Sequence, residues 1–414
     1  MLLSKETTIK VTDIQSNIIG HLGYAAYKLW NILKYERDHY ASLSLTEYPD
    51  WYYQKKTHKT DFWYKSLPSQ TAQEVCKLLD KSYKSYFTLF KTGGVENPRP
   101  PKYKHDKMPV TYMQNGITHT GNTIRLSLPK ALKQHMADRF DIHENYLYLK
   151  NKIFESMDQI KQIKLYMPED HICRIIVIYE ITDVQELSDN GRYLSIDLGV
   201  HNMMTTYDNV SCASVIYGRR YSEILHYYDK KIAHFQSISD GQQSAKGIRY
   251  PKKSKQVLTL YRKKKNTVHD LLHKTTRQIV DYCIANDIHT VIIGDLTGIR
   301  KDNDHGPVVN QKFHQLPYKK ITELLTYKLA LYGIRLVAIS EAYSSQTSPQ
   351  APFVSKYYAT PDKRERRGLY IDNNAIYNAD AVGAYNILRL YLQKENISIT
   401  LPYDRLCSPK KVAV

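Results

Sequence analysis

The chain has 414 residues and a formal net charge of +18, because 59 lysines and arginines stand against 41 aspartates and glutamates. No apolar stretch is long enough for a membrane span, and the start lacks the apolar core of a signal peptide. The five cysteines are far apart and form no CxxC pair. This pattern argues against a cysteine zinc ribbon or a disulfide framework, and we expect a reducing cytoplasm.

The excess of positive charge predicts a polyanionic partner. Lysines are mixed with 36 tyrosines along the chain. Aromatic rings stack on bases while lysines follow phosphates, so this mixture is typical of nucleic-acid binding. The alternative is a compositional bias with no bearing on function.

The N-terminal part predicts one strand followed by helices. Residues 2–12 alternate loosely and are rich in threonine, isoleucine and valine, which indicates a strand. Thr12 offers an N-cap for an amphipathic helix that reaches about residue 38. A second helix begins after Pro68, and Gly93 ends it.

A proline-rich basic stretch at 97–104 separates these helices from a region of short strands. Prolines hold this stretch extended, with its basic residues displayed outward. The short strands dominate from about 108 to 184. We expect a β-rich module that the N-terminal strand completes, with the helices inserted in it.

Beyond a polar stretch at 188–191 the pattern becomes α/β. The expected elements are a strand at 193–198, hairpin strands at 203–207, 211–217 and 222–228, a long basic helix at 253–286, a strand at 289–293, a helix at 317–332, a strand at 335–339 and a final helix at 379–394. This is the order of an RNase H-like fold. In that fold the first strand is central, the fourth pairs beside it, and the fifth lies beyond the fourth.

Acidic residues lie on or at the ends of three of these strands and at the start of the last helix. Asp197 lies on the first strand, Asp295 ends the fourth after Gly294, Glu341 ends the fifth, and Asp380 opens the last helix. Neighbouring strands are only about 4.8 Å apart. A long glutamate on the fifth strand can therefore reach a metal that the fourth strand would ordinarily serve.

Carboxylate oxygens are the ligands that Mg²⁺ prefers, and two ions roughly 3.5–4 Å apart can clamp a phosphodiester. We therefore predict Asp197, Glu341 and Asp380 as catalytic residues that also bind two Mg²⁺ ions. For each acid there is also an alternative role that is structural and not catalytic. Asp197 and Asp295 suit turns or caps, Asp380 suits an N-cap, and Glu341 suits a strand end exposed to solvent.

At these residues the chain resembles the TnpB family, the RNA-guided nucleases of insertion sequences that are ancestral to type V CRISPR effectors. Residues 195–200, with Asp197, resemble the first RuvC motif, and residues 378–387 resemble the third. Residues 67–72, 100–104 and 271–276 resemble further family signatures. The resemblance covers most of the chain, and the third motif is its most specific part.

The chain departs from the family pattern at two places. Gly294 takes the position of the usual second-motif glutamate, and Glu341 matches a relocated form found in some members. Ser348 and Ala351 stand where the first cysteine pair of a zinc ribbon would be. The resemblance therefore implies Mg²⁺ without zinc, and the loop at 347–372 must be held by packing or by nucleic acid.

The resemblance also implies domains and partners. Residues 1–12 and 96–187 would form a barrel-like wedge β-module, 13–95 a helical recognition domain, and 188–414 a RuvC-like nuclease domain. The partners would be a guide RNA from the transposon end and double-stranded target DNA beside a short motif, and the location would be the prokaryotic cytoplasm or nucleoid. The residues expected to contact nucleic acid are Arg99, Lys102, Lys104, Arg262, Lys263, Lys264, Lys265, Arg364 and Arg367. For the run at 262–265, a solvated helix face is the alternative.

Three functions remain open at this point. The first is an RNA-guided endonuclease that cuts double-stranded DNA by two-metal phosphodiester hydrolysis. The second is an RNA-guided repressor that binds DNA without cutting it, which the glycine at 294 and the missing thiols suggest. The third is a transposase or resolvase built on the same fold.

Overall fold

The structure, a computed structural model, describes residues 1–93, 95–182, 184–199, 202–296, 315–360, 363, 368–372 and 375–413. The chain divides into two compact units, 1–183 and 184–414, which we call unit 1 and unit 2 and describe separately. Among the described helices, none is both long enough and apolar enough to cross a membrane.

The helices of unit 1 follow the capping signals of the sequence. They are α1 (Asp13–Asp38), α2 (Trp51–Thr57), α3 (Phe62–Lys65), α4 (Ser69–Thr92) and α5 (Lys130–Phe140), with 3₁₀ turns η1 (His58–Thr60), η2 (Gln114–Gly116) and η3 (Lys152–Ser156). Thr12 Oγ1 accepts from the Gln15 N–H at 3.2 Å, and Gln15 Oε1 accepts from the Thr12 N–H at 2.9 Å. Gly93 ends α4 at a φ of 61°, which glycine adopts without strain. The two long helices are thus confirmed, whereas α2, α3 and α5 were not expected.

The strands of unit 1 form two antiparallel sheets. The first runs in the order β1 (Leu2–Lys10), β7 (Ile172–Glu180), β6 (Gln159–Leu165), β2 (Val110–Met113), and the second in the order β3 (Ile117–Thr120), β4 (Thr123–Ser127), β5 (Tyr146–Lys150). β1 pairs along its whole length with β7. The N-terminal strand therefore completes the β-rich module, as expected. A single hydrophobic core, which includes Ile19, Val75, Ile124 and Val177, joins the helices to both sheets.

Unit 2 is built on one six-stranded sheet. Its elements are β8 (Tyr193–Asp197), β9 (Met204–Asp208), β10 (Ser214–Tyr217), α6 (Arg220–Ala245), α7 (Lys255–Ala285), β11 (Thr290–Asp295), α9 (Tyr318–Ala330), β12 (Arg335–Ser340), β13 (Leu369–Asp372), β14 (Ala375–Asn378), α10 (Ala379–Glu395), η5 (Asp404–Cys407) and β15 (Lys410–Lys411). The sheet order is β12-β11-β8-β9-β10-β15. β8 pairs antiparallel with β9 and parallel with β11, and β12 is parallel to β11. The predicted strand order, with β8 central, is confirmed.

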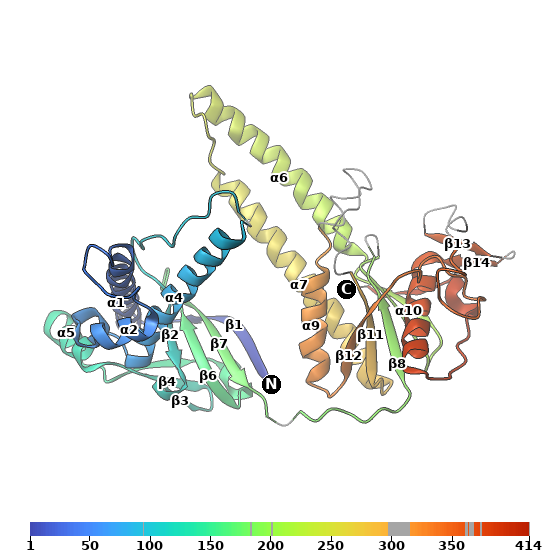
Figure 1. The fold of residues 1–414 in the computed structure, drawn as a ribbon, viewed down its shortest axis with the longest axis horizontal. Coiled ribbons are helices and arrows are strands. Elements are labelled where there is room, and N and C mark those ends of the chain that lie inside the picture. The colour runs from blue at the N-terminus through green and yellow to red at the C-terminus, as the bar shows by residue number, and fades with distance from the viewer. Residues whose placement is uncertain are drawn as a thin grey trace. The chain divides into compact units, whose positions relative to one another are not determined.

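The predicted strand at 222–228 is wrong, because these residues lie in α6. The buried Tyr221, Leu225 and Ile232 of this helix follow one another at intervals of four and seven, the spacing of one helix face. A short window does not separate that spacing from the alternation of a strand. α6 packs along α7 as a long hairpin of two helices (Figure 1).

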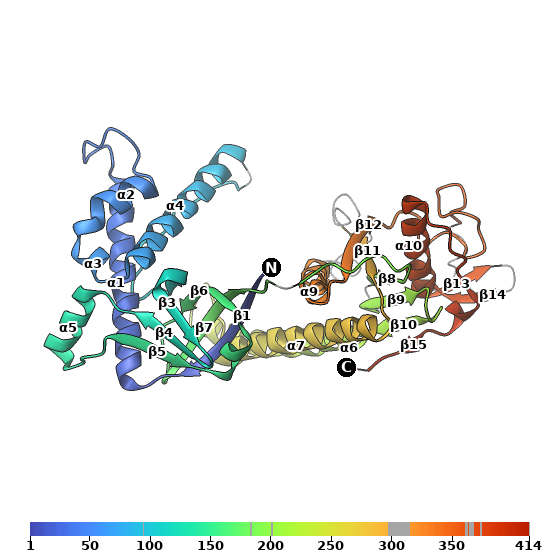
Figure 2. The ribbon, with the colours of Figure 1, turned by 90° about the horizontal axis from the view of Figure 1, so that it is seen from below.

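Helices cover both faces of the sheet (Figure 1). One hydrophobic core lies between the sheet and helices α7 and α9, and it takes Leu194 and Ile196 from β8. A second core lies between the sheet and α10, and it takes Tyr193 of β8 and Ile292 of β11. β13 and β14 pair into a hairpin that lies beside α10 (Figure 2).

Candidate functional site

Two of the three predicted acids, Asp197 and Glu341, lie on the sheet face under α10. Along β8 every second residue points to this helix. The Tyr193 ring lies 5.5 Å from that of Tyr391, and Ser195 Oγ donates to the Ala384 carbonyl at 2.6 Å. Asp197 is the next residue on this face. A methyl group at Gly383 would lie only 2.6 Å from Asp197 Oδ2, so glycine lets the helix approach the carboxylate closely.

Gly294 leaves the space that Glu341 fills. Ile293 of β11 is opposite Ile196 of β8, so Gly294 is level with Asp197 one residue further along. On β12, Ile339 is opposite Gly294 and packs in the core under α10, and Glu341 follows two residues later on the same face. A Cβ atom at position 294 would overlap Glu341 Oε2. The glycine thus makes room for a carboxylate from the neighbouring strand.

The carboxyl group of Glu341 is held in an environment that disfavours its charged form. Its Oε2 atom is buried and has no hydrogen-bond partner among the described residues. Burial first, and the nearby charge of Asp295 second, raise the pKa of Glu341 from 4.5 to about 7. A buried carboxylate oxygen without a donor is the kind of atom that a hard cation would satisfy.

Asp380 is fixed at the first turn of α10. Asn378 caps this helix, and its Oδ1 accepts from the N–H groups of Asp380 and Ala381 at 3.2 and 3.0 Å. Asn202 Nδ2 donates to Asp380 Oδ2 at 2.7 Å. An acid at this end also suits the helix dipole. The capping role belongs to Asn378, so the N-cap reading of Asp380 is wrong.

Asp197 and Glu341 lie on the sheet face under α10, and Asp380 lies on α10 itself. Within the described ranges, no three His, Cys, Asp or Glu side chains are grouped so that they could hold a metal ion. The donor types, and above all the unsatisfied Oε2 of Glu341, nevertheless fit Mg²⁺. Asp295 differs from the three acids, because it ends β11 one residue after Gly294 and is exposed.

Two α10 residues that the sequence did not single out hold the loop after Glu341. Asn386 is fully buried, and its Nδ2 donates to the carbonyls of Ser344 and Thr347 at 2.7 Å each. Arg389 donates to the Ser348 carbonyl at 3.2 Å and also to the Ala351 carbonyl. The helix that carries Asp380 therefore also fixes the loop that begins at Glu341. Asn386 falls inside the third motif, and a polar residue in the middle of an apolar helix was the available signal.

The loop in the zinc-ribbon position is held by polar side chains. Ser348 Oγ donates to the buried carboxylate of Asp372, which also forms an ion pair with Lys363. The Gln346 carbonyl accepts from the N–H of Thr360 at 2.8 Å and from the hydroxyl of Tyr370 at 3.2 Å. The loop was expected to be held either by packing within the protein or by nucleic acid. These hydrogen bonds and this ion pair are contacts within the protein.

The candidate nucleic-acid contacts of unit 1 lie on the proline-rich stretch. Arg99, Lys102 and Lys104 are all exposed. α1 anchors the backbone beneath them. The Trp30 indole donates to the Lys102 carbonyl at 3.1 Å, and Asn31 exchanges two hydrogen bonds of 2.8 Å with the backbone of Lys104.

The basic run on α7 is not uniform. Arg262, Lys263 and Lys265 are exposed, whereas the ammonium group of Lys264 lies 2.5 Å from the Asp229 carboxylate on α6. This ion pair ties the two helices together. Arg364 and Arg367 lie outside the described residues.

Comparisons with known proteins define the class of the fold. Residues 176–300 match the family OrfB_IS605, described as a probable transposase, and residues 318–387 match the family described as Cas12f1-like, TNB domain. No curated protein matches the chain in sequence. A solved Cas12f1–sgRNA–target DNA complex matches with a TM-score of 0.59 and 14% identity over 91% of this chain and 83% of that chain. The mini RNA-guided endonuclease CRISPR-Cas_phi3 matches with a TM-score of 0.46 and 10% identity over 94% and 92%.

At this identity the Cas12f1 likeness speaks to the fold alone, and it confirms the expected α/β nuclease fold. The fold and the two family matches together fit a TnpB-family protein. The resemblance predicted from the sequence motifs is therefore confirmed.

Proposed function

We propose that this protein is an RNA-guided, Mg²⁺-dependent endonuclease that cuts double-stranded DNA beside a short motif. The family matches and the Cas12f-like fold support the nuclease class. The matched Cas12f1 structure is a complex with a single guide RNA and target DNA, which supports the same two partners here. The net charge of +18 agrees with a polyanionic partner.

One observation carries the active-site assignment. Glu341 Oε2 is buried and has no hydrogen-bond partner within the part of the chain that the structure describes. It lies against Gly294, the residue level with Asp197 on the next strand. Leaving a carboxylate oxygen buried and unpaired is unfavourable unless a cation or a proton meets it. The strand and helix ends that surround Glu341 also carry Asp197 and Asp380, so a divalent cation at this edge would find oxygen ligands from three elements.

The residues around the acids supply orientation. Asn202 holds one oxygen of Asp380, and the Asn378 cap fixes the turn on which Asp380 stands. Glu341 is placed by β12 and by the loop that Asn386 holds. When bound, Mg²⁺ would neutralise phosphate charge and make a bound water more acidic.

Substitution of the acids tests this assignment. Asp197→Ala or Asp380→Ala should abolish DNA cleavage and leave RNA-directed DNA binding intact. Asp281→Asn is the matched control, because Asp281 is exposed on α7 away from the three acids and should keep cleavage. Unchanged cleavage in either alanine variant would refute the metal assignment.

A non-cleaving repressor is the second candidate. The observation that favours it is that the described residues contain no ready-made group of three metal-binding side chains. Glu341→Gln decides between the two, since the repressor requires that neither protein cuts, whereas the nuclease requires that only the wild type does. Sequencing the RNA that co-purifies with the protein, and repeating the cleavage after its removal, separates a guided nuclease from a resolvase.

A further inference from the structure

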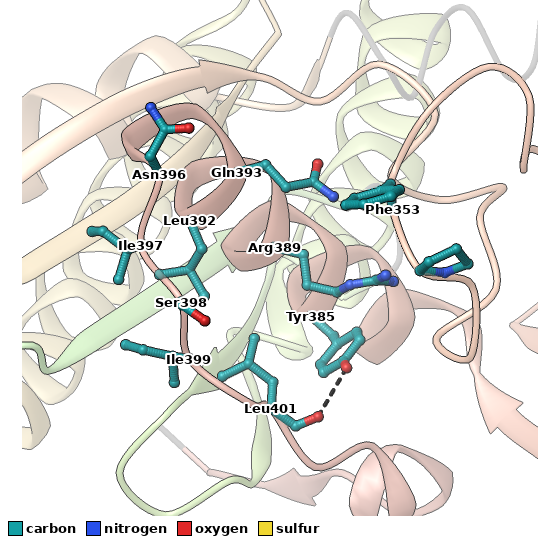
Figure 3. Close-up of a pocket in the computed structure, with 11 residues that line it drawn as sticks. Phe353, Tyr385, Arg389, Leu392, Gln393, Asn396, Ile397, Ser398, Ile399 and Leu401 are labelled. Atoms are coloured by element: carbon teal, nitrogen blue, oxygen red, sulfur yellow. Dashed lines mark hydrogen bonds between the residues drawn. The ribbon is translucent and has the colours of Figure 1, made fainter.

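A pocket of about 680 Å³ lies in unit 2 at the C-terminal half of α10 (Figure 3). Asp380 stands at the other end of the same helix. The walls of the pocket come from α10, from the segment 396–401 that comes after it, and from Pro352 and Phe353 of the loop in the zinc-ribbon position. Pockets of this size hold ligands as large as a nucleotide.

The floor of this pocket is apolar and fixed. Leu392 and Leu401 are buried, and the buried Tyr385 hydroxyl donates to the Leu401 carbonyl at 3.0 Å, the dashed line in Figure 3. Arg389 fixes the opposite rim, because its guanidinium donates to the Ala351 carbonyl just before Pro352. A ligand would therefore meet a preformed surface.

The pocket is poorly suited to an anion such as phosphate. Both terminal nitrogens of Arg389 already donate within the protein. Nη1 donates to the Ser348 carbonyl and to Asn386 Oδ1, the latter at 2.9 Å, and Nη2 donates to the Ala351 carbonyl. Burial also lowers the pKa of the Arg389 guanidinium. The C-terminal end of α10 adds the negative end of the helix dipole. A neutral ring with polar edges fits these walls better than a phosphate.

An exposed aromatic ring stands beside an unused amide in this pocket. Phe353 is 59% exposed. Figure 3 shows the Gln393 side chain reaching toward the Phe353 ring, with Asn396 at the far end. Among the described residues neither amide has a hydrogen-bond partner, so each offers a donor and an acceptor to a ligand. This arrangement suits a nucleobase, because the base can stack on the aromatic ring while its polar edge forms hydrogen bonds with the amide.

We propose that this pocket binds an unpaired base of single-stranded nucleic acid, with the base stacked on Phe353 and its polar edge read by Gln393. The proposal deepens the nucleic-acid function proposed above by naming a base contact away from the acids. The proposal rests on that function in one respect, because unwinding and cutting of DNA would produce the single-stranded ligand. It is tested without guide RNA, in a chelator, where no cleavage occurs.

Photocrosslinking gives the direct test. The full chain is irradiated with a single-stranded oligonucleotide that carries 5-iodouracil, in DNA and RNA versions, and the crosslinked residue is identified by mass spectrometry. We expect the crosslink at Phe353, because the excited base reacts with the ring on which it stacks. Tyr357 is the internal control, since it is 86% exposed on the same loop but does not line the pocket. A crosslink at Tyr357 and not at Phe353 would overturn the proposal. Whether the DNA or the RNA oligonucleotide crosslinks to Phe353 identifies which nucleic acid the pocket binds.

Binding measurements give an independent test. Phe353→Ala should weaken binding of the oligonucleotide about tenfold, and Gln393→Ala should weaken it less, while Tyr357→Ala leaves it unchanged. An oligonucleotide of abasic sites should bind wild type and Phe353→Ala equally. The salt dependence should not change in Phe353→Ala, because no phosphate contact is lost. Equal losses in Phe353→Ala and Tyr357→Ala, or a loss that persists with the abasic strand, would contradict base stacking.

Loss of cleavage in Asp197→Ala with normal crosslinking separates this site from the active site.

Discussion

The carboxyl group of Glu341 shows how a single residue links fold stability to metal binding. Its Oε2 atom is buried and meets no hydrogen-bond donor from any described residue, and its pKa is raised to about 7. The folded protein therefore holds this proton more tightly than the unfolded chain does. Stability from this group is fully present below a pH of about 4.5 and is lost as the pH rises through about 7.

This linkage makes a prediction for Glu341→Gln in the metal-free protein. At pH 8 the variant should be more stable than wild type by up to about 3 kcal/mol, because glutamine carries no charge to bury. At pH 4.5 the difference should vanish. The measurement is urea unfolding followed by far-UV circular dichroism in a chelator. Millimolar Mg²⁺ should then stabilise wild type at pH 8 more than the variant. Parallel pH profiles for the two proteins would contradict the burial of this charge.

At the scale of elements, α10 joins Asp380 to the loop that begins at Glu341. Asn386 makes this connection through two hydrogen bonds to loop carbonyls. Asn386→Ala leaves both carbonyls without that donor, and we expect unit 2 to lose about 2–4 kcal/mol. Asn386→Asp should lose a similar amount, since a carboxylate cannot donate. Gln393→Ala on the same helix is the matched control and should change stability little.

The positions of the tryptophans decide how this loss is measured. Trp30, Trp51 and Trp63 are the three tryptophans of the chain, and all lie in unit 1. Tryptophan fluorescence therefore reports on unit 1, and hydrogen exchange of α10 peptides reports on unit 2. We expect faster exchange in α10 of Asn386→Ala while the fluorescence transition stays in place. Unchanged exchange would show that the loop does not depend on Asn386.

Elements with strong periodicity could be predicted from the sequence, and tertiary contacts could not. The N-cap at Thr12 and the apolar run before Gly294 predicted α1 and β11, because the signals are local. α6 was misread at 222–228 because a few residues carry too little of the helical period. The role of Asn386 was missed because its partners, the carbonyls of Ser344 and Thr347, are defined only once the chain is folded. Glu341 was singled out because a glycine at 294 implied a vacant space on the adjacent strand, and its side chain fills that space. Its catalytic role stays a prediction.

At the scale of the whole molecule, the net charge of +18 predicts binding to nucleic acid that depends strongly on salt. Each phosphate contact releases counterions, so a protein with six to ten such contacts loses about 10³–10⁵ in affinity between 50 and 200 mM salt. We expect a loss toward the lower end of this range for a single-stranded oligonucleotide. A nearly flat salt dependence would mean that the charge serves solubility.

The basic run at 262–265 of α7 provides a test variant and a control for this salt dependence, because three of its side chains are free to contact phosphates and one is ion-paired. Arg262, Lys263 and Lys265 are exposed, whereas Lys264 is paired with Asp229. Replacing the three exposed residues by alanine should reduce the slope of log affinity against log salt by about 2, at about 0.7 for each single-strand phosphate contact. Lys264→Ala should leave the slope nearly unchanged, since its charge is already neutralised by an acid. The measurement is a salt titration of oligonucleotide binding by fluorescence anisotropy. Equal slopes for all variants would assign the run to a solvated helix face.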